Sequence, residues 1–263
     1  MKTLQNKIAL VTGASQGIGK SIAEKLGGAG ATLAVAALEN EALEKANADY
    51  KALGFRFKSY GVDLSMDSHI ESLAHSVVRD LGPVDVLVNN AGIGGPTAPA
   101  HKVAPADFDK TLQINLRAPF LLSRAIIPSM IDRKGGKIIN MSSIAGKMAY
   151  PLRTPYACSK WGLIGLTLTL AQELGPYNIQ VNAICPGPTR TELIESVIRA
   201  RAEATGTDFE TMSQEYVRAT ALKRMVLPEE VADLVLFLSS SQSDAITGQA
   251  IDISAGYGFR IGE

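Results

Sequence analysis

Three polar side chains are spaced so that together they can move a proton. Tyr156 and Lys160 lie four residues apart, and Ser143 lies upstream of them. Residues at i and i+4 share one helix face, and an ammonium beside a phenol favours the phenolate. We therefore expect Lys160 to lower the pKa of Tyr156 from its ordinary value of about 10. The same spacing also occurs in solvated pairs on exposed helices, so the rest of the chain decides its meaning.

A glycine-rich turn, residues 12–19, follows the first apolar run at 8–11 and precedes a helical segment at 20–26. Glycines permit a tight turn and a close approach of backbone to a pyrophosphate, and the helix N-terminus offers free N–H groups. The GxxxGxG spacing departs from the usual GxGxxG fingerprint. Its position between a strand and a helix predicts a dinucleotide site, and the alternative is a turn needed only for packing.

The elements that position these residues alternate along the whole chain. Apolar runs typical of buried strands lie at 8–11, 33–38, 55–62, 84–88, 137–141, 179–184 and 249–253. Helical patterns lie at 20–26, 39–53, 70–81, 105–132, 155–174 and 228–238, with Pro119 and Pro128 as expected kinks or joints. The alternation predicts an α/β fold, a single-domain, Rossmann-like, doubly wound parallel sheet of about seven strands with helices on both faces. No linker divides residues 1–263.

Composition and charge narrow the classes of partner. The 26 Lys and Arg residues balance 26 Asp and Glu residues, which argues against nucleic acid or an anionic membrane as the main partner. No apolar run is long enough for a membrane span. The two cysteines and three scattered histidines form no metal-ligand pattern, and we expect the histidines at the surface. We expect a cytoplasmic protein without a metal site.

Six motifs stand in an order and spacing that resemble the short-chain dehydrogenase/reductase family, over about residues 5–256. In detail the chain looks like the branch of 3-oxoacyl-carrier-protein reductases and sugar or polyol dehydrogenases. The motifs are Thr12-Gly13-x-x-x-Gly17-x-Gly19, Asn89-Asn90-Ala91-Gly92, Asn115, Ser143, Tyr156-x-x-x-Lys160 and Pro186-Gly187.

The resemblance implies a catalytic role for four residues. Tyr156 would be the general acid in carbonyl reduction and the general base in alcohol oxidation. Lys160 would lower its pKa and bond the nicotinamide ribose, and Ser143 would orient the substrate carbonyl, with Ser142 as the alternative. Asn115 would hold a water of a proton relay from Lys160, or else its side chain is simply bonded to nearby backbone.

The resemblance also implies a set of cofactor-binding residues. Asp63 would meet the adenine amine, and Thr191 the carboxamide. Asn89 and Ala91 would flank the adenine ribose, Gly92 would leave space, and Pro186 and Gly187 would position the nicotinamide ring. The full set is Gly13, Ser15, Gln16, Gly17, Ile18, Gly19, Asp63, Asn89, Ala91, Gly92, Tyr156, Lys160, Pro186, Gly187 and Thr191.

The sequence favours NAD over NADP without excluding NADP. Ala37 stands where NAD enzymes of the family carry an acid, which departs from the NAD pattern. Gln16 replaces the basic residue often found in the loop, and no Lys or Arg lies between residues 32 and 43. Glu39 and Glu41 would repel a ribose phosphate.

The substrate side carries fewer signals. A substrate lid is expected around residues 188–225, with an apolar stripe of Leu193, Ile194, Val197 and Ile198. Arginines 153, 190, 199 and 201 lie near the expected mouth of the site. They suggest an anionic substrate such as a carboxylate, because Arg binds carboxylates with two parallel hydrogen bonds. The alternative is a solvated helix face.

The leading hypothesis is an NAD(P)-dependent oxidoreductase that interconverts a secondary alcohol and a ketone. Its small-molecule substrate would be a polyol, sugar or hydroxy acid. A 3-oxoacyl-carrier-protein reductase is an alternative, although the neutral charge provides no obvious docking patch for a carrier protein. An isomerase or dehydratase stays open on this fold. A non-catalytic dinucleotide-binding regulator is the other class, and the intact trio counts against it. The family resemblance implies a homotetramer.

Overall fold

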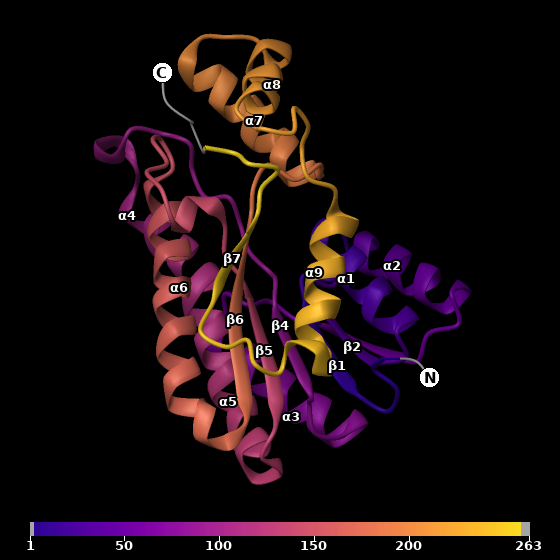
Figure 1. Cartoon of the computed structure of the whole chain (residues 1–263). Coiled ribbons are helices and arrows are strands. Elements are labelled where there is room, and N and C mark those ends of the chain that lie inside the picture. The colour runs from indigo at the N-terminus through magenta and orange to yellow at the C-terminus, as the bar shows by residue number, and fades with distance from the viewer. Residues whose placement is uncertain (1–2, 259–263) are drawn as a thin grey trace.

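Seven parallel strands form one sheet at the centre of the molecule (Figure 1). The structure is a computed structural model, and it describes residues 3–258. The strands are β1 Ile8–Thr12, β2 Thr32–Ala37, β3 Phe57–Gly61, β4 Val86–Asn89, β5 Gly136–Met141, β6 Ile179–Pro186 and β7 Ala250–Ile253. Their order across the sheet is β3-β2-β1-β4-β5-β6-β7. The predicted doubly wound parallel sheet is confirmed.

Helices cover both faces of this sheet. On one side lie α1, α2 and α9, and on the other lie α3, α5 and α6 (Figure 1). The helices are α1 Gly17–Gly28, α2 Glu41–Ala52, α3 Asp67–Leu81, α4 Pro105–Leu112, α5 Ala118–Arg133, α6 Thr154–Leu174, α7 Glu192–Thr205, α8 Phe209–Arg218 and α9 Pro228–Ser239.

The alternation of side chains along each strand builds the two halves of the core. In β1, Ala9 and Val11 pack into the cluster under α1 and α9, whereas Leu10 packs into the cluster under α3 and α5. All three are fully buried. Side chains of a strand point alternately to the two faces, so a strand covered on both sides must be apolar throughout.

Two predicted segments differ from the structure. The helical stretch expected at 105–132, with kinks or joints at Pro119 and Pro128, is two helices, α4 and α5, joined by a π-helical turn at Gln113–Arg117, just before Pro119. Pro119 lies in the first turn of α5, directly after the π-helical turn, and Pro128 lies inside that helix. The helix expected at 20–26 is longer at both ends, since α1 runs from Gly17 through Gly28. A Cβ on Gly27 would lie 2.8 Å from the Phe55 ring, so helix packing requires glycine there.

The strand order places a crevice at one edge of the sheet. The chain runs from β1 outward to β2 and β3 and then returns to β4 on the other side of β1. Loops that leave β1 and β4 therefore diverge, and ligands of such sheets bind between them at the carboxyl ends of the strands. Helices α7 and α8 rise over this edge at the top of Figure 1 and occupy most of the segment expected to form a lid.

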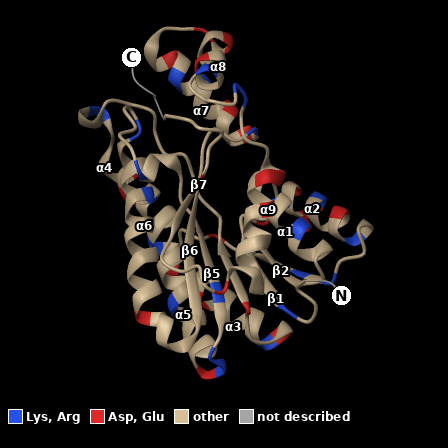
Figure 2. Ribbon diagram, in the orientation of Figure 1, with Lys and Arg blue, Asp and Glu red and all other residues tan. Residues whose placement is uncertain are grey.

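Acidic and basic residues are interspersed over the helices (Figure 2).

Candidate functional site

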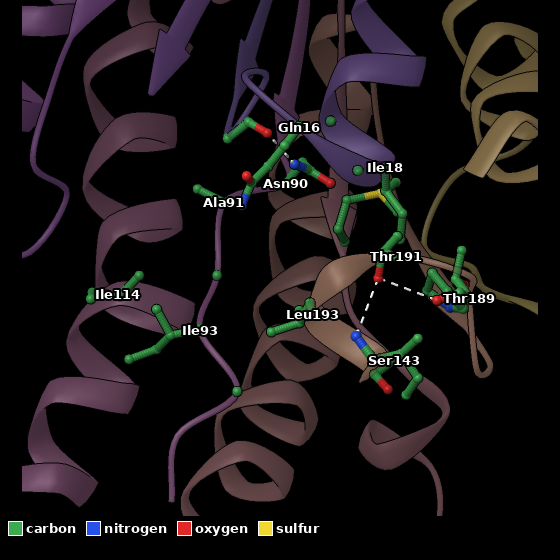
Figure 3. Close-up of a pocket in the computed structure, with 18 of the residues that line it drawn as sticks. Gln16, Ile18, Asn90, Ala91, Ile93, Ile114, Ser143, Thr189, Thr191 and Leu193 are labelled. Carbon is green, nitrogen blue, oxygen red and sulfur yellow. Dashed lines mark hydrogen bonds between the residues drawn. The ribbon is translucent and has the colours of Figure 1, made fainter. Parts of the chain in front are cut away.

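A cleft of about 650 Å³ opens at the carboxyl ends of β1, β4, β5 and β6. The glycine loop and Asn90 line one end, and Ser143 and Leu193 line the other end (Figure 3). The predicted residues that line it are Gly13, Ser15, Gln16, Gly17, Ile18, Gly19, Asp63, Ala91, Gly92, Ser143, Tyr156, Lys160, Pro186, Gly187 and Thr191. Asn89 and Asn115 are the two that do not.

The glycine loop encloses a space that larger side chains in the loop would fill. Gly13 and Gly17 have φ values of +65° and +53°, which favour glycine. A Cβ on Gly19 would lie 2.1 Å from the carbonyl oxygen of Gly13, so only glycine fits. Gln16 precedes α1, and its side chain makes no capping bond to the helix N-terminus. First-turn N–H groups of α1 are therefore left for an anionic ligand. These features fit a dinucleotide pyrophosphate.

Asn89 does not lie in the cleft, which corrects the expectation that it flanks the adenine ribose. It is the last residue of β4, and its buried amide donates to Ser123 Oγ at 3.1 Å and Asn140 Oδ1 at 2.8 Å. Asn90 lines the cleft instead, and its amide donates to Thr12 O at 2.9 Å. Successive strand residues point to opposite sides, so the register of β4 decided between the two.

The end of β2 carries no charged group into the cleft. Ala37, Leu38 and Asn40 line it, and Asn40 caps α2 by accepting from Leu43 N at 3.2 Å.

Of the two acids near this end, Glu39 does not line the cleft. Its side chain lies over Gly61 of the neighbouring strand. Asp63 is the acid that lines this end, and hydrogen bonds from Ser65 hold the pKa of its carboxyl below the usual value.

Tyr156 and Lys160 point from the first turns of α6 into the other end of the cleft. Lys160 is buried, and its ammonium donates to the carbonyl oxygen of Met141 at 2.8 Å. The same nitrogen lies 5.6 Å from the centre of the Tyr156 ring. The i, i+4 spacing therefore places the ammonium and the phenol in one site, as the sequence predicts.

Ser143 fits the role of the third polar group better than Ser142. Both line the cleft at the end of β5. The Ser142 hydroxyl is already committed, because it donates to the Lys160 carbonyl oxygen at 2.9 Å. The Ser143 hydroxyl accepts from Ala145 N at 3.1 Å, so its own proton stays available to a substrate oxygen.

The pKa of Tyr156 does not follow the expected direction. Burial in the cleft raises it above its ordinary value, and the Ser143 hydroxyl and the Arg153 charge act against that rise. Burial also lowers the pKa of Lys160 to about 8, because the protein does not solvate its ammonium as water does. The expectation that Lys160 lowers the pKa of Tyr156 overlooked that the phenol is itself desolvated.

Asn115 lies behind the cleft in the π-helical turn. Its amide accepts from Ile93 N at 2.8 Å and donates to Ile93 O at 2.9 Å and to Ser159 Oγ at 3.1 Å. The side chain is therefore bonded to backbone, as the alternative interpretation has it. A Cβ on Gly92 would lie 3.1 Å from Asn115 Oδ1 and 3.6 Å from Lys160 Nζ, so both groups flank the same glycine.

The loop after β6 closes this end of the cleft. Pro186, Gly187 and Thr191 line it, although a Cβ on Gly187 would lie 2.7 Å from the Cα of Ser254, so this glycine also serves packing. Thr191 caps α7 by accepting from Ile194 N at 3.3 Å and donates to Thr189 O at 3.2 Å (Figure 3).

The apolar stripe of the expected lid is present on α7. Leu193, Ile194 and Val197 line the cleft, whereas Ile198 packs into a separate cluster with α8. Of the four arginines noted in the sequence, only Arg153 is buried at the cleft. Arg190 and Arg199 are exposed, and Arg201 is partly buried beside Tyr216.

Sequence reasoning missed Tyr150, Ile93 and Gly94, which line the substrate end. Tyr150 donates or accepts a hydrogen bond at 3.4 Å with Tyr216 of α8. These residues lie in irregular loops with no motif of their own. Only their positions in the sequence, directly after β4 or shortly before the helix that carries Tyr156, could have indicated that they line the cleft. Among residues 3–258 no group of acids, histidines or cysteines is arranged to hold a metal ion, and no helix is long and apolar enough to cross a membrane.

The family model described as short chain dehydrogenase matches residues 7–202. The 3-oxoacyl-[acyl-carrier-protein] reductase FabG of Thermotoga maritima is 35% identical over 258 residues, which cover 96% of this chain and 98% of that protein. This chain belongs to the short-chain dehydrogenase/reductase family.

Solved structures of the family share the fold over almost the whole chain. An NAD+-bound xylitol dehydrogenase matches with a TM-score of 0.93 and 34% identity, over 97% of this chain and 100% of its own. A variant of actinorhodin polyketide ketoreductase with NADPH matches with a TM-score of 0.94 and 33% identity, over 99% of this chain and 100% of its own. These two relatives each bind a nicotinamide dinucleotide, one as NAD+ and the other as NADPH.

Proposed function

We propose that this protein interconverts a secondary alcohol and a ketone in an NAD(P)-dependent reaction, with Tyr156 as acid and base. One observation carries the proposal. The glycine loop, which fits a pyrophosphate, and the polar trio of Ser143, Tyr156 and Lys160 line the same cleft. A nicotinamide bound along that cleft would supply or accept the hydride.

The residues of the chain handle the proton and the substrate oxygen. In reduction, the Tyr156 phenol donates its proton to the carbonyl oxygen, and the raised pKa keeps that proton in place until a substrate arrives. The Ser143 hydroxyl donates to the same oxygen and orients it. Lys160 stands behind the phenol and returns a proton to it, and Asn115 holds the backbone of Ile93 beside that path. In oxidation each proton moves in the opposite direction.

We propose NAD rather than NADP as the preferred cofactor. No Lys or Arg among the described residues lines the cleft at the end of β2, so a ribose phosphate finds no cation there. The Asp63 carboxylate at the same end disfavours a second anion. Asn40, with an amide nitrogen, is the polar side chain available to ribose hydroxyls.

The substrate is a small polyol, sugar or hydroxy acid in this proposal. Helix α7 covers the cleft with apolar side chains, and Ser143, Tyr150 and Tyr156 supply hydroxyls. The Thermotoga maritima relative favours a second candidate, a 3-oxoacyl-carrier-protein reductase. A non-catalytic regulator would need the glycine loop but not the three catalytic side chains.

We also propose that the protein is a homotetramer. β7 is an edge strand of the sheet, and α6 beside it exposes Trp161 and Leu168, at 53% and 46%. Unpaired strand edges and exposed large apolar side chains mark association surfaces.

A panel of alcohols and ketones with both cofactors tests the proposed reaction, followed through the absorbance of the reduced nicotinamide. We expect turnover with a higher kcat/KM for NAD, and a tenfold preference for NADP would contradict the cofactor proposal. Tyr156→Phe should lower kcat by about 10²- to 10⁴-fold, because the proton donor is lost. Cofactor binding should change little.

Tyr177→Phe is the matched control for this variant. It removes the same hydroxyl from an exposed position outside the cleft and should keep the parent activity. Activity of Tyr156→Phe within tenfold of the parent would refute the role of Tyr156.

A further inference from the structure

Arg153 is a buried guanidinium at the substrate end of the cleft. It precedes α6, with 3% of its surface exposed, and it lines the cleft beside Gly94 and Tyr156. Its two terminal nitrogens each make one hydrogen bond, to Thr97 Oγ1 at 3.1 Å and to Gly94 O at 2.7 Å. Its Nε is buried and has no hydrogen-bond partner among residues 3–258. Two of five N–H donors are therefore satisfied by the protein.

No acid neutralises this charge within the described residues. Arg153 takes part in none of the ion pairs among residues 3–258. The acids that line the cleft are Asp63, at the adenine end, and the exposed Glu192 at the start of α7. A buried charge is costly unless it is paired, and neither Thr97 nor Gly94 requires a charged donor. The uncompensated cation therefore points to a ligand that carries a negative charge.

The position of Arg153 relative to Tyr156 limits the size of that ligand. The guanidinium carbon lies 5.3 Å from the centre of the Tyr156 ring. Lys160 adds a second cation near the phenol, 5.6 Å from the ring centre, and apolar side chains of α7 line the same cleft. An anionic group on the guanidinium and an oxygen at the Tyr156 hydroxyl can therefore belong to one short molecule. Low water content strengthens the attraction between such charges.

We propose that Arg153 binds the carboxylate of the substrate, so that the substrates are short hydroxy acids and the corresponding oxo acids rather than neutral polyols. The inference rests on the proposed alcohol–ketone reaction and adds its substrate class. The guanidinium is planar and presents parallel N–H groups, which match a carboxylate better than a hydroxyl. The carboxylate itself is unchanged in the reaction. The carbinol carbon at position 2 or 3 would pass a hydride to the oxidised nicotinamide, and its hydroxyl a proton to the Tyr156 phenolate, which leaves the oxo acid.

Matched substrate pairs test this proposal. Short 2- and 3-hydroxy acids are each compared with the primary amide of the same acid, with NAD and the parent enzyme. We expect kcat/KM to favour the acid by about 10- to 100-fold, since a hydrogen bond to a charged group is worth that ratio. Arg153→Gln should remove most of the preference, chiefly through a higher KM for the acid, and Arg153→Lys should retain part of it.

Comparing acid with amide removes effects that are common to both substrates. Loss of the Arg153 charge next to Tyr156 changes the proton donor equally for acid and amide, so their ratio reports recognition alone. Arg199→Gln is the matched control, because Arg199 is exposed on α7, stacks on Phe209 and does not line the cleft. It should leave the ratio at the parent value.

The outcomes separate this inference from the proposed function. A parent that turns over amides and neutral alcohols as well as acids would overturn the role of Arg153 and leave the alcohol–ketone reaction intact. An unchanged ratio in folded Arg153→Gln would overturn it too. If Arg153→Gln does not fold, the acid-to-amide ratio of kcat/KM in the parent and in Arg153→Lys decides whether Arg153 binds the carboxylate. A parent without turnover of any alcohol or ketone would instead reject the proposed function.

Discussion

Burial controls the chemistry of individual residues in this cleft. Burial disfavours the charged forms of both Tyr156 and Lys160, so the pKa of the phenol rises while that of the ammonium falls to about 8. The sequence spacing predicts that the two groups meet, and the structure confirms their proximity. It does not predict their desolvation or the second cation, Arg153, because both depend on loops and helices far apart in the chain.

The lowered pKa of Lys160 predicts a dependence of stability on pH. Below about pH 8 the ammonium is charged in both states, and the folded state carries the full cost of burying it. Between pH 8 and about 10.4 the folded state loses this proton first, so the unfolded state binds more protons and the free energy of unfolding rises. The gain is about 3 kcal/mol, since each unit of pKa difference corresponds to about 1.4 kcal/mol.

Lys160→Met isolates this contribution, since methionine has a similar size and no charge. The free energy of unfolding of the parent minus that of Lys160→Met, measured in urea from pH 7 to 10.5, should increase with pH over the upper part of that range. A difference that stays constant would contradict the assignment. The same variant should lose turnover.

At the scale of elements, glycine positions decide how β1 continues into α1. The loop turns through Gly13 and Gly17 and brings the start of α1 against its own strand, where Gly19 contacts the Gly13 carbonyl. The sequence predicts the loop and its ligand from composition and order. It does not predict the π-helical turn at Gln113–Arg117, because the segment has no glycine or proline and Asn115 is held there by bonds to the distant Ile93.

Two alanine substitutions within α1 separate packing from helix propensity. Gly19→Ala would place a Cβ against backbone, and we expect it to destabilise the fold by about 2 kcal/mol or more and to weaken dinucleotide binding. Gly28→Ala meets no atom within 4 Å and should stabilise by up to about 1 kcal/mol. Urea unfolding and cofactor titration of both variants measure these effects. Equal stability of the two variants would show that the close contact at Gly19 is relieved without cost.

At the scale of the whole molecule, the parallel sheet leaves β7 as one outer edge, next to the exposed side chains of α6. All seven strands were expected from apolar runs, and each was located within about two residues of its observed bounds. A strand pattern does not state its neighbours, however, so the sheet order and its edges required the structure.

The proposed homotetramer predicts a mass of about four chains by light scattering at micromolar concentration. Trp161→Glu places a charge in the exposed apolar surface of α6 and should lower that mass, because burying an unpaired carboxylate is costly. Phe237→Glu on α9, also exposed and apolar, is the control and should keep the parent mass. A monomeric parent would rule out the assembly.

The sequence by itself determined the fold class, the family and the residues to which we assign the proton chemistry. These follow from local regularities: strand and helix periodicity, a glycine turn between them, and side chains four residues apart on one helix. The tertiary structure decided which side chains reach the cleft. Asn90 lines the cleft, whereas Asn89 does not. The Ser142 hydroxyl donates to a backbone carbonyl, whereas the Ser143 hydroxyl can donate to a substrate. Arg153 is buried without a counter-charge among the described residues. Strand register, loop path and burial set these outcomes, and each depends on contacts between distant parts of the chain.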